Sequence, residues 1–304
     1  MSPSNSTNYS LIDFSQNLAE IVKTVGKSVV AINGKHFSCS GVCWREGIIV
    51  TSNESIKHPE KATIAYSNGE TVPVTLLGRD RSTDIAVFKT EAAIPTAPIN
   101  SNYELQVGQV AIAIGRDKKR GLFASQGIVN TVGGSWLSSL GGQIDRFIRL
   151  DLNFYPGSGG SALVNAAGQV MGFNTTGPRR SVLTIPAVTV NRVVDLLLET
   201  GHLRRGYLGL SMQPVYLPDF LLDKLSFSNR QGLMVVGIEP NSPAQQAGIF
   251  LGDILTKIES TSIAKLRDIQ VYLEPQNVGK TINIELIRAG NLQNLSLTVG
   301  ELGD

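Results

Sequence analysis

The sequence predicts a mainly β protein with two folded units, an all-β barrel pair or sandwich followed by a compact α+β domain. Three observations support this. The 304 residues exceed the usual size of a single core. Strand-like runs recur about every ten residues through the first part of the chain. The 31 glycines and the low aromatic content of 6% suit short strands joined by tight turns.

An N-terminal segment, residues 1–26, precedes the strands. Within it, residues 10–26 carry apolar side chains at helical spacing from Leu11 to Val22, and Gly26 is a plausible stop. We therefore expect a helix there.

The next part, residues 27–200, reads as strands punctuated by Gly, Asn, Asp and Pro, and it ends in one helix that begins at Asn191 and stops near Gly201. The expected strands are Val29–Ile32, Gly47–Val50, Thr63–Tyr66, Val72–Leu77, Ile85–Lys89, Val110–Ile114, Gly127–Thr131, Arg146–Leu150, Gln169–Phe173 and Ser181–Ile185.

A second domain, residues 206–304, follows a short linker at about residues 201–205. This domain mixes helix-like and strand-like residue patterns, and helices are predicted at "SPAQQAG" (242–248) and "KLRDIQVYLE" (265–274). The strand-like stretches are "GYLGLSMQPV" (206–215), "GLMVVGIEP" (232–240), "DILTKIE" (253–259), "TINIELIR" (281–288) and "LQNLSLTVG" (292–300).

Charge and hydropathy exclude several classes of function. A net charge of +2 is too small to predict a nucleic-acid partner or an anionic membrane surface. The basic cluster Arg116, Lys118, Lys119 and Arg120 is expected to be a solvated loop. No run of 18 apolar residues predicts a membrane span.

The two cysteines, Cys39 and Cys43, are four residues apart. On an extended strand this spacing is about 13 Å, against the roughly 4.4–6.8 Å between Cα atoms that a disulfide needs. We expect free buried thiols. These thiols, and a start without a signal-peptide pattern, favour a cytoplasmic location, or a periplasmic one if the chain is a trimmed mature form.

Five stretches in this order resemble the HtrA (Deg) family. They are "TDIAVFK" (83–89), "VGQVAIAIG" (107–115), "GIV" (127–129), "DLNFYPGSGGSALVNAAGQVMGFNT" (151–175) and "RRGYLGL" (204–210). The resemblance covers nearly the whole chain from about residue 12. It implies a trypsin-like double six-stranded β-barrel, a C-terminal PDZ domain of α+β type, and serine endopeptidase ancestry without a cofactor.

The same resemblance shows a degenerate catalytic triad. Asp84 in "TDIAVFK" takes the family's Asp position. Glu54 in "TSNES" falls where the His belongs, and in "YPGSGGSAL" Gly159 falls on the nucleophile. A serine hydroxyl is a weak nucleophile until a His removes its proton, so both departures oppose proteolysis.

Ser158 keeps an enzyme alternative open, because a one-residue shift of the turn would restore Ser-Gly-Gly. Glu54 would then have to act as the base, and a carboxylate is a poorer proton acceptor than imidazole. The three histidines, His36, His58 and His202, occupy no recognisable catalytic pattern.

Glu54 and Asp84 are expected to lie close together, which would raise the pKa of at least one of them. Two oxygen ligands are too few to predict a metal site. For Glu54 we expect instead a hydrogen bond to a neighbour such as Ser55 or Ser158.

The second domain carries the peptide-binding prediction. PDZ domains add a peptide C-terminus as a strand at a sheet edge, with its carboxylate on the backbone amides of a loop. Matching that loop gives Tyr207, Leu208, Gly209 and Leu210. Leu210 and Met212 would line the pocket opposite Ile269 or Leu273. A purely core role for Leu210 and Met212 is the alternative.

Three functions remain open. The first is an inactive HtrA-like pseudoprotease that binds unfolded or C-terminal peptide segments as a chaperone or regulator. The second is a serine endopeptidase that uses Ser158. The third is a scaffold that assembles with other HtrA-type subunits, as a homo-oligomer with a trimer as one option.

Overall fold

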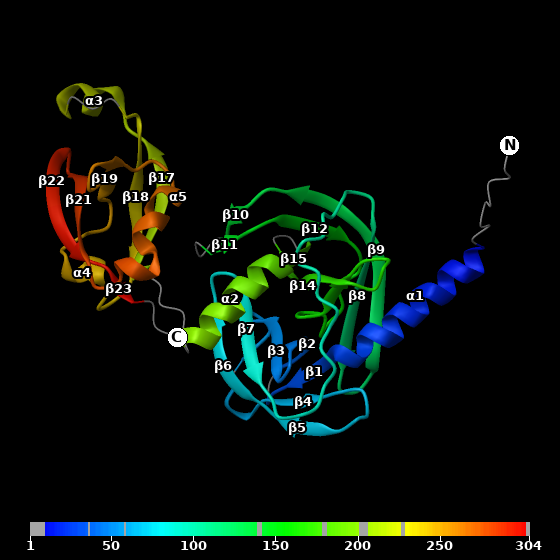
Figure 1. Ribbon diagram of the computed structural model, residues 1–304. Coiled ribbons are helices and arrows are strands. Elements are labelled where there is room, and N and C mark those ends of the chain that lie inside the picture. Colours follow the sequence, from blue (N-terminus) through cyan, green and yellow to red (C-terminus); the bar gives the residue numbers. More distant parts are fainter. Residues whose placement is uncertain are drawn as a thin grey trace, which may run out of the picture. The chain divides into compact units, whose positions relative to one another are not determined.

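The computed structural model describes residues 10–35, 37–57, 59–138, 142–177, 181–200, 206–225 and 229–301. The chain divides into two compact units, Met1–His202 and Leu203–Asp304 (Figure 1). The three histidines and the expected linker lie outside the described residues. Among the described residues, no helix is long and apolar enough to cross a membrane.

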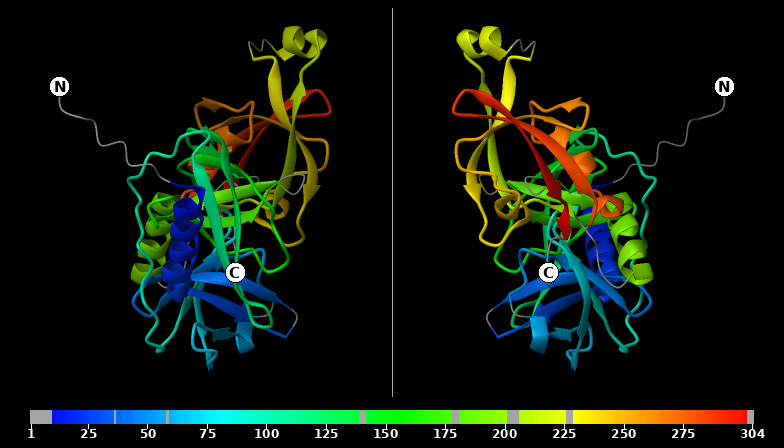
Figure 2. Two further views of the ribbon diagram at one scale, coloured as in Figure 1. Left: turned by 90° about the vertical axis from the view of Figure 1, so that its right-hand side faces the viewer. Right: turned by 90° about the vertical axis from the view of Figure 1, so that its left-hand side faces the viewer.

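The first unit opens with helix α1 (Leu11–Val25). Its N-terminus is closed by a capping box, in which Ser10 and Asp13 each satisfy the other's backbone N–H. The helix ends at Gly26, where a 3₁₀ turn, η1 (Gly26–Ser28), begins. The predicted helix is confirmed. Its second half lies against strands β8 and β9 of the same unit, as the views in Figures 1 and 2 agree.

A seven-stranded antiparallel sheet follows, in the order β5-β4-β1-β2-β3-β7-β6. Its strands are β1 (Val29–Asn33), β2 (Ser38–Arg45), β3 (Ile48–Ser52), β4 (Thr63–Ala65), β5 (Thr71–Pro73), β6 (Thr75–Asp80) and β7 (Ile85–Lys89). A short 3₁₀ turn, η2 (Pro59–Lys61), precedes β4. This half therefore has seven strands where six were expected. Strand β2 was absent from the expected set because small Ser, Gly and Cys residues are buried on both of its faces, which removes the alternation of a half-buried strand.

The second half of this unit is a closed six-stranded barrel, as expected, in the order β12-β15-β14-β13-β8-β9. Its strands are β8 (Val110–Asp117), β9 (Gly121–Gly133), β12 (Phe147–Asp151), β13 (Ala162–Val164), β14 (Val170–Thr176) and β15 (Val182–Pro186). Strands β10 (Trp136–Leu137) and β11 (Gln143–Ile144) form a separate short hairpin.

Helix α2 (Ala187–Thr200) completes the unit and begins four residues before the expected start at Asn191. The helical pattern of buried residues extends back to Ala187 and Val190, which accounts for the earlier start. Two side-chain contacts tie α2 to strand β2: Trp44 donates to Asn191 at 2.7 Å, and Arg45 pairs with Asp195 at 2.7 Å.

The second unit is built on a sheet in the order β17-β18-β19-β21-β22. The strands of the unit are β16 (Gly206–Tyr207), β17 (Leu210–Tyr216), β18 (Gln231–Ile238), β19 (Ile254–Ile258), β20 (Thr261–Ser262), β21 (Thr281–Arg288), β22 (Asn291–Thr298) and β23 (Gly300–Glu301). Strand β20 pairs with β19, and β16 and β23 pair with each other as a separate two-stranded sheet. The helices are α3 (Asp219–Leu225), α4 (Pro243–Gln246), α5 (Arg267–Gln270), η4 (Val271–Leu273) and η5 (Pro275–Asn277).

The helix expected over 265–274 is shorter than predicted. It is α-helical only over Arg267–Gln270 and continues as the 3₁₀ turn η4. Glu274 is extended because it precedes Pro275, whose ring disfavours a helical residue before it. The segment places Ile269, Tyr272 and Leu273 against the core without forming a long helix.

Strand β17 is an edge strand, since β18 is its one neighbour in the sheet order. Its side chains alternate, so that Leu210 and Met212 are partly buried against the core while Ser211 and Gln213 face outwards. In the part of the chain that the structure describes, no strand lies along the other edge of β17, which is therefore available for strand addition.

Candidate functional site

Asp84 lies at the start of β7 and joins the two halves of the first unit. Its backbone has a left-handed φ of 60°, and its carbonyl accepts the N–H of Asn53 at 3.1 Å. Its Oδ1 accepts the amide N–H of Glu54 at 2.7 Å. Its Oδ2 accepts the hydroxyls of Ser52, at 2.8 Å, and of Thr175, at 2.5 Å. The carboxylate is therefore bonded from β3, from the loop after β3, and from β14.

Burial raises the pKa of Asp84 from 3.8 to about 6. The three hydrogen bonds to the carboxylate oppose that rise, and the nearby charge of Glu54 adds to it slightly. The expected rise in the pKa of one of the two carboxyls is confirmed, but burial rather than like charge is its main cause.

Glu54, at the position of the family's His, is exposed. Within the described residues its carboxylate makes no hydrogen bond, so the expected bond to Ser55 or Ser158 is not formed. The side chain lines a cavity of about 430 Å³ together with Asp84. The cavity is completed by Arg81, Ser82, Thr83, Trp136, Ser138, Ile144, Thr175, Thr176, Gly177, Leu183 and Ile185.

Ser158 lies in the nucleophile turn, which we define as residues 155–160. It is 3% exposed. Its Oγ accepts the N–H of Tyr155 at 3.1 Å, and its own N–H donates to the carbonyl of Tyr155 at 2.9 Å. The hydroxyl and the N–H of Ser158 therefore both bond to Tyr155, while its carbonyl accepts the N–H of Ser161 at 2.9 Å.

Contacts from β2 and from the β8–β9 turn hold the nucleophile turn in place. Ser40 donates from its Oγ to the carbonyl of Gly157 at 2.9 Å, and from its N–H to the carbonyl of Gly159 at 2.9 Å. Arg120 donates to the carbonyl of Pro156 at 2.6 Å. Arg120 and Arg116 of the basic cluster thus have structural partners, since Arg116 bonds the carbonyls of Gly26 and Val29.

The amide N–H groups of Gly157 and Gly159 are not tied in this way: neither donates a hydrogen bond within the described part of the chain. Amides at a nucleophile turn are the donors that stabilise an oxyanion in acyl-transfer enzymes. The turn therefore presents two such N–H groups beside Gly159, the residue that the resemblance aligns with the nucleophile.

Ser52 and Thr175 were missed by sequence reasoning, although both bond Asp84 directly. Ser52 lies two residues before Glu54 in the "TSNES" stretch, and this position beside a candidate site residue was a signal that could have identified it. Thr175 closes the quoted stretch 151–175 and carries no signal of its own.

In the second unit, the loop between β16 and β17 carries the predicted carboxylate-binding residues. Gly209 has a φ of 76°, which favours glycine, and a Cβ there would lie 2.1 Å from the Cβ of Ser242. Among the described residues, the N–H groups of Leu208 and Gly209 donate to no acceptor. Tyr207 donates its hydroxyl to Glu239, and burial, followed by that bond, raises the pKa of Tyr207 to about 12.

The predicted pocket residues divide into two groups. Leu208 and Ile269 are buried in the core of the unit. Leu210 and Met212 are partly buried against that core, as are Tyr272 and Leu273 of η4. The partly buried residues are the ones available to a ligand along β17.

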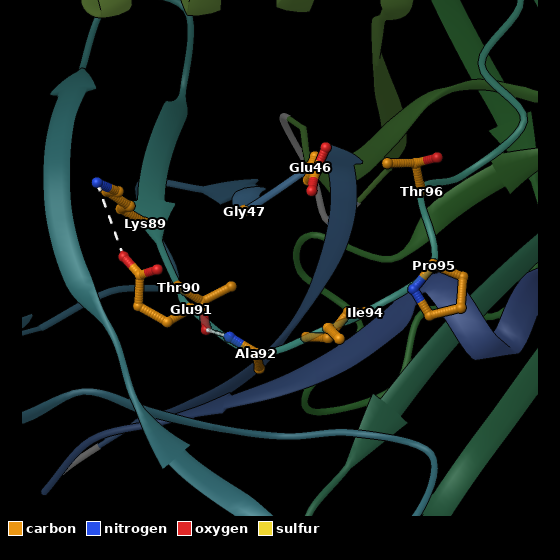
Figure 3. Close-up of a pocket in the computed structure, with 10 residues that line it drawn as sticks. Glu46, Gly47, Lys89, Thr90, Glu91, Ala92, Ile94, Pro95 and Thr96 are labelled. Atoms are coloured by element: carbon orange, nitrogen blue, oxygen red, sulfur yellow. Dashed lines mark hydrogen bonds and ion pairs between the residues drawn. The ribbon is translucent and has the colours of Figure 1, made fainter.

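A further hollow, of about 670 Å³, is lined by Glu46, Gly47 and residues 89–96 (Figure 3). Lys89 pairs with Glu91 at 3.7 Å, and the Thr90 hydroxyl accepts the N–H of Ala92 at 3.2 Å. The hollow includes Lys89, the last residue of the "TDIAVFK" stretch, but Glu54, Asp84, Ser158 and Gly159 do not line it.

Comparison with known proteins agrees with this division. Residues 39–173 match the family described as trypsin-like peptidase domain, and residues 206–299 match the PDZ domain. The serine endoprotease DegS of Haemophilus influenzae is 27% identical over 268 residues, covering 84% of this chain and 75% of the relative. DegS of Escherichia coli K12 is 28% identical over 271 residues, covering 84% and 74%.

Solved structures give the same result. The serine endoprotease from Yersinia pestis has a TM-score of 0.71 at 27% identity, and the likeness covers 100% of both chains. The HtrA-type protease AlgW with a tripeptide has a TM-score of 0.68 at 26% identity, covering 94% of this chain and 97% of the other. With the motifs, both domain matches and the fold in agreement, the chain belongs to the HtrA/Deg family.

Proposed function

We propose that this HtrA-family chain binds peptide segments and does not cleave them. The observation that carries the proposal is the nucleophile turn, where position 159 is a glycine and Ser158 is buried with its hydroxyl bonded to the N–H of Tyr155. Position 54 holds an exposed Glu instead of the base. Removing one member of a triad typically costs on the order of 10⁴–10⁶ in turnover, and here two are replaced.

Peptide binding is assigned to the second unit. The edge strand β17 offers backbone groups for an added strand, and the N–H groups of Leu208 and Gly209, which have no acceptor among the described residues, can receive a terminal carboxylate. Leu210 and Met212 place partly buried apolar side chains along this strand. The ligand class is therefore a C-terminal or unfolded segment that ends in an apolar residue, and the role is that of a chaperone or a regulator.

The enzyme alternative uses Ser158 as nucleophile and keeps the activity named for the relatives, which are serine endoproteases. It requires the nucleophile turn to open, so that the Ser158 hydroxyl leaves Tyr155 and reaches the cavity beside Glu54.

The test is to incubate the purified chain with unfolded casein and, in parallel, with a fluorophosphonate probe, with Ser158→Ala as the control. We expect casein to bind without cleavage and the probe to leave every serine unlabelled. Cleavage and labelling that both vanish in Ser158→Ala would establish the enzyme alternative. A DegS relative handled in the same way provides the positive control.

The scaffold alternative is favoured by helix α1, whose Leu11 and Ile12 are 87% and 69% exposed. Apolar residues at the start of an otherwise packed helix suit a contact with further subunits, as a homo-oligomer or with other HtrA-type chains. Measuring the molar mass of the wild type and of Leu11→Asp separates this role from the others, since only an assembly through α1 would dissociate.

Two compartments are proposed for the chain. Cys39 and Cys43 are free and buried, as expected, which is consistent with the cytoplasmic prediction. A DegP-like relative from Halomonas elongata, 26% identical over 271 residues, is named periplasmic, which favours the periplasm. Fractionation of cells that express the chain distinguishes them.

A further inference from the structure

The side chain of Ser55 faces Gly159 across the site. Ser55 belongs to the loop after β3, and Gly159 belongs to the nucleophile turn before β13. A Cβ built on Gly159 would lie 2.0 Å from the Oγ of Ser55 and 3.2 Å from its Cβ. A nucleophile at position 159 would start from that same Cβ.

The backbone does not require glycine at position 159. Gly157 and Gly160, on either side of Ser158 and Gly159, have φ values of 89° and 80°, where glycine is strongly favoured. Gly159 has no such angle. The feature that crowds a side chain at position 159 is therefore the contact with Ser55.

We propose that Ser55 fills the place of the missing nucleophile side chain and keeps the acyl-transfer position closed. This inference rests on the proposed function and deepens it, because it links the missing side chain at Gly159 to the side chain of Ser55 that lies in its place. The hydroxyl of Ser55 can rotate away from a new side chain. Its Cβ cannot, so the loop after β3 must shift before residue 159 can carry a Cβ comfortably.

Ser55 does not replace the nucleophile in this arrangement. Within the described residues its hydroxyl has no hydrogen-bond partner, and the carboxylates of Glu54 and Asp84 are not bonded to it. A serine without a base remains a weak nucleophile. Its role is to occupy space beside the free amides of Gly157 and Gly159.

A double-mutant cycle on the whole chain tests the contact. Both tryptophans, Trp44 and Trp136, lie in the first unit, so their fluorescence in urea reports the unfolding of that unit. We expect Gly159→Ala to lower the urea midpoint, and Ser55→Gly in the same chain to reduce that shift by about half or more. Ser55→Ala should give an intermediate result, because it removes the hydroxyl and keeps the Cβ.

Gly134→Ala is the matched control, since a Cβ there meets nothing within 4 Å. Its effect should be small and should not depend on residue 55. If Gly159→Ala shifted the midpoint equally in the wild-type background and in the Ser55→Gly background, the proposal would be overturned, whatever the activity of the chain.

Labelling by a fluorophosphonate tests the consequence. Glu54→His with Gly159→Ser restores the base and the nucleophile, and adding Ser55→Gly removes the obstacle. We expect the triple variant to label at residue 159 at least about tenfold faster than the double variant. Equal rates, or no labelling of either variant, would count against Ser55 as the closing residue.

The wild type distinguishes the two proposals. Labelling at Ser158 would overturn the proposed function alone and leave the unfolding cycle intact. Labelling at Ser55 would show that Ser55 is itself a nucleophile, and would overturn the proposal that it only occupies space.

Discussion

The amide N–H of Glu54 donates a hydrogen bond of 2.7 Å to Oδ1 of Asp84. Glu54, which the resemblance aligns with the family's His, is thus bonded through its backbone to Asp84, which the resemblance aligns with the Asp, while the exposed Glu54 side chain takes no part. Ser52 and Thr175 complete the bonding of the carboxylate at Oδ2. Asp84 therefore has a structural role, joining β3, β7 and β14, that does not depend on a catalytic His.

The first prediction concerns pH. Burial raises the pKa of Asp84 to about 6 from an ordinary 3.8. Between these values the folded chain holds a proton that the unfolded chain has lost, so the free energy of unfolding falls as the pH rises and levels off above about pH 6. At about 1.4 kcal/mol per pH unit, this amounts to roughly 3 kcal/mol.

Asp84→Asn removes that titration while keeping the size of the side chain. Between pH 4 and pH 8 the wild type should lose roughly 2 kcal/mol of unfolding free energy relative to Asp84→Asn, because at pH 4 the unfolded carboxyl is already partly ionised. Urea unfolding followed by tryptophan fluorescence measures it. A difference that is independent of pH would show that the carboxyl titrates normally.

The second prediction concerns the groove of the second unit. Glu in place of Met212 would put a charge where the structure has a partly buried apolar side chain against the core. Met212→Glu should weaken binding of a peptide with a free apolar C-terminus by at least about tenfold, measured by fluorescence anisotropy.

Gln213→Glu is the matched control, because Gln213 is exposed on the opposite face of the same strand and gains the same charge. It should change the affinity by less than about threefold. Equal losses in the two variants would mean that β17 is not the binding strand. Amidation of the peptide's C-terminus should also weaken binding, if the Leu208 and Gly209 amides receive the carboxylate.

Sequence reasoning located Asp84, Glu54 and Gly159 because each lies in a short stretch with a recognisable order of residues. It could not show what surrounds them. Ser52 and Thr175 are far apart in the chain and reach the same carboxylate from different sheets. The contact between Ser55 and Gly159 likewise depends on how two loops meet, which no periodicity records.

The fold was predicted better than its local details. Alternation and turn residues were enough for most strands. Strand β2 lacks alternation because it is buried on both faces. The segment 265–274 has an apolar pattern typical of a helix, yet the β-branched Ile269 and Val271 and the following Pro275 weaken helix formation, so most of its length is not α-helical.

The third prediction concerns the buried ion pair of the second unit. Arg288 donates to both oxygens of Asp253, at 2.8 and 2.6 Å, and the Asp253 side chain is 2% exposed. Arg288 also bonds the carbonyl of Gly248 and stacks on Phe250 at 4.5 Å. Arg288→Met leaves the buried carboxylate without its charged partner, although the N–H of Phe250 still donates to it at 2.8 Å, and should cost about 3–5 kcal/mol of unfolding free energy in this unit.

Hydrogen exchange of the β19 and β21 amides measures that loss, since both strands belong to the second unit. Arg230→Met is the control, because the pair of Arg230 and Asp219 is largely exposed and should contribute less than about 1 kcal/mol. Similar protection in both variants would show that the buried pair contributes no more than a surface pair.

The fourth prediction concerns Ser40, which supports the nucleophile turn from β2. Its buried hydroxyl donates to the carbonyl of Gly157 at 2.9 Å and accepts the N–H of Arg116 at 3.0 Å. Ser40→Ala removes both bonds and leaves two backbone groups without these partners, at a cost of about 1–3 kcal/mol. Urea unfolding by tryptophan fluorescence measures the effect on the first unit.

Ser38→Ala, on the same strand, is the comparison for Ser40→Ala. The Ser38 hydroxyl is exposed and bonds Asn33 at 2.9 Å, so its removal should cost less than about 0.5 kcal/mol. If Ser40→Ala were equally mild, the turn would not depend on β2 for its position. A large cost for Ser40→Ala alone would mean that the chain maintains the geometry of the nucleophile turn without a nucleophile, as expected if the turn's remaining role is to keep the two halves of the first unit joined.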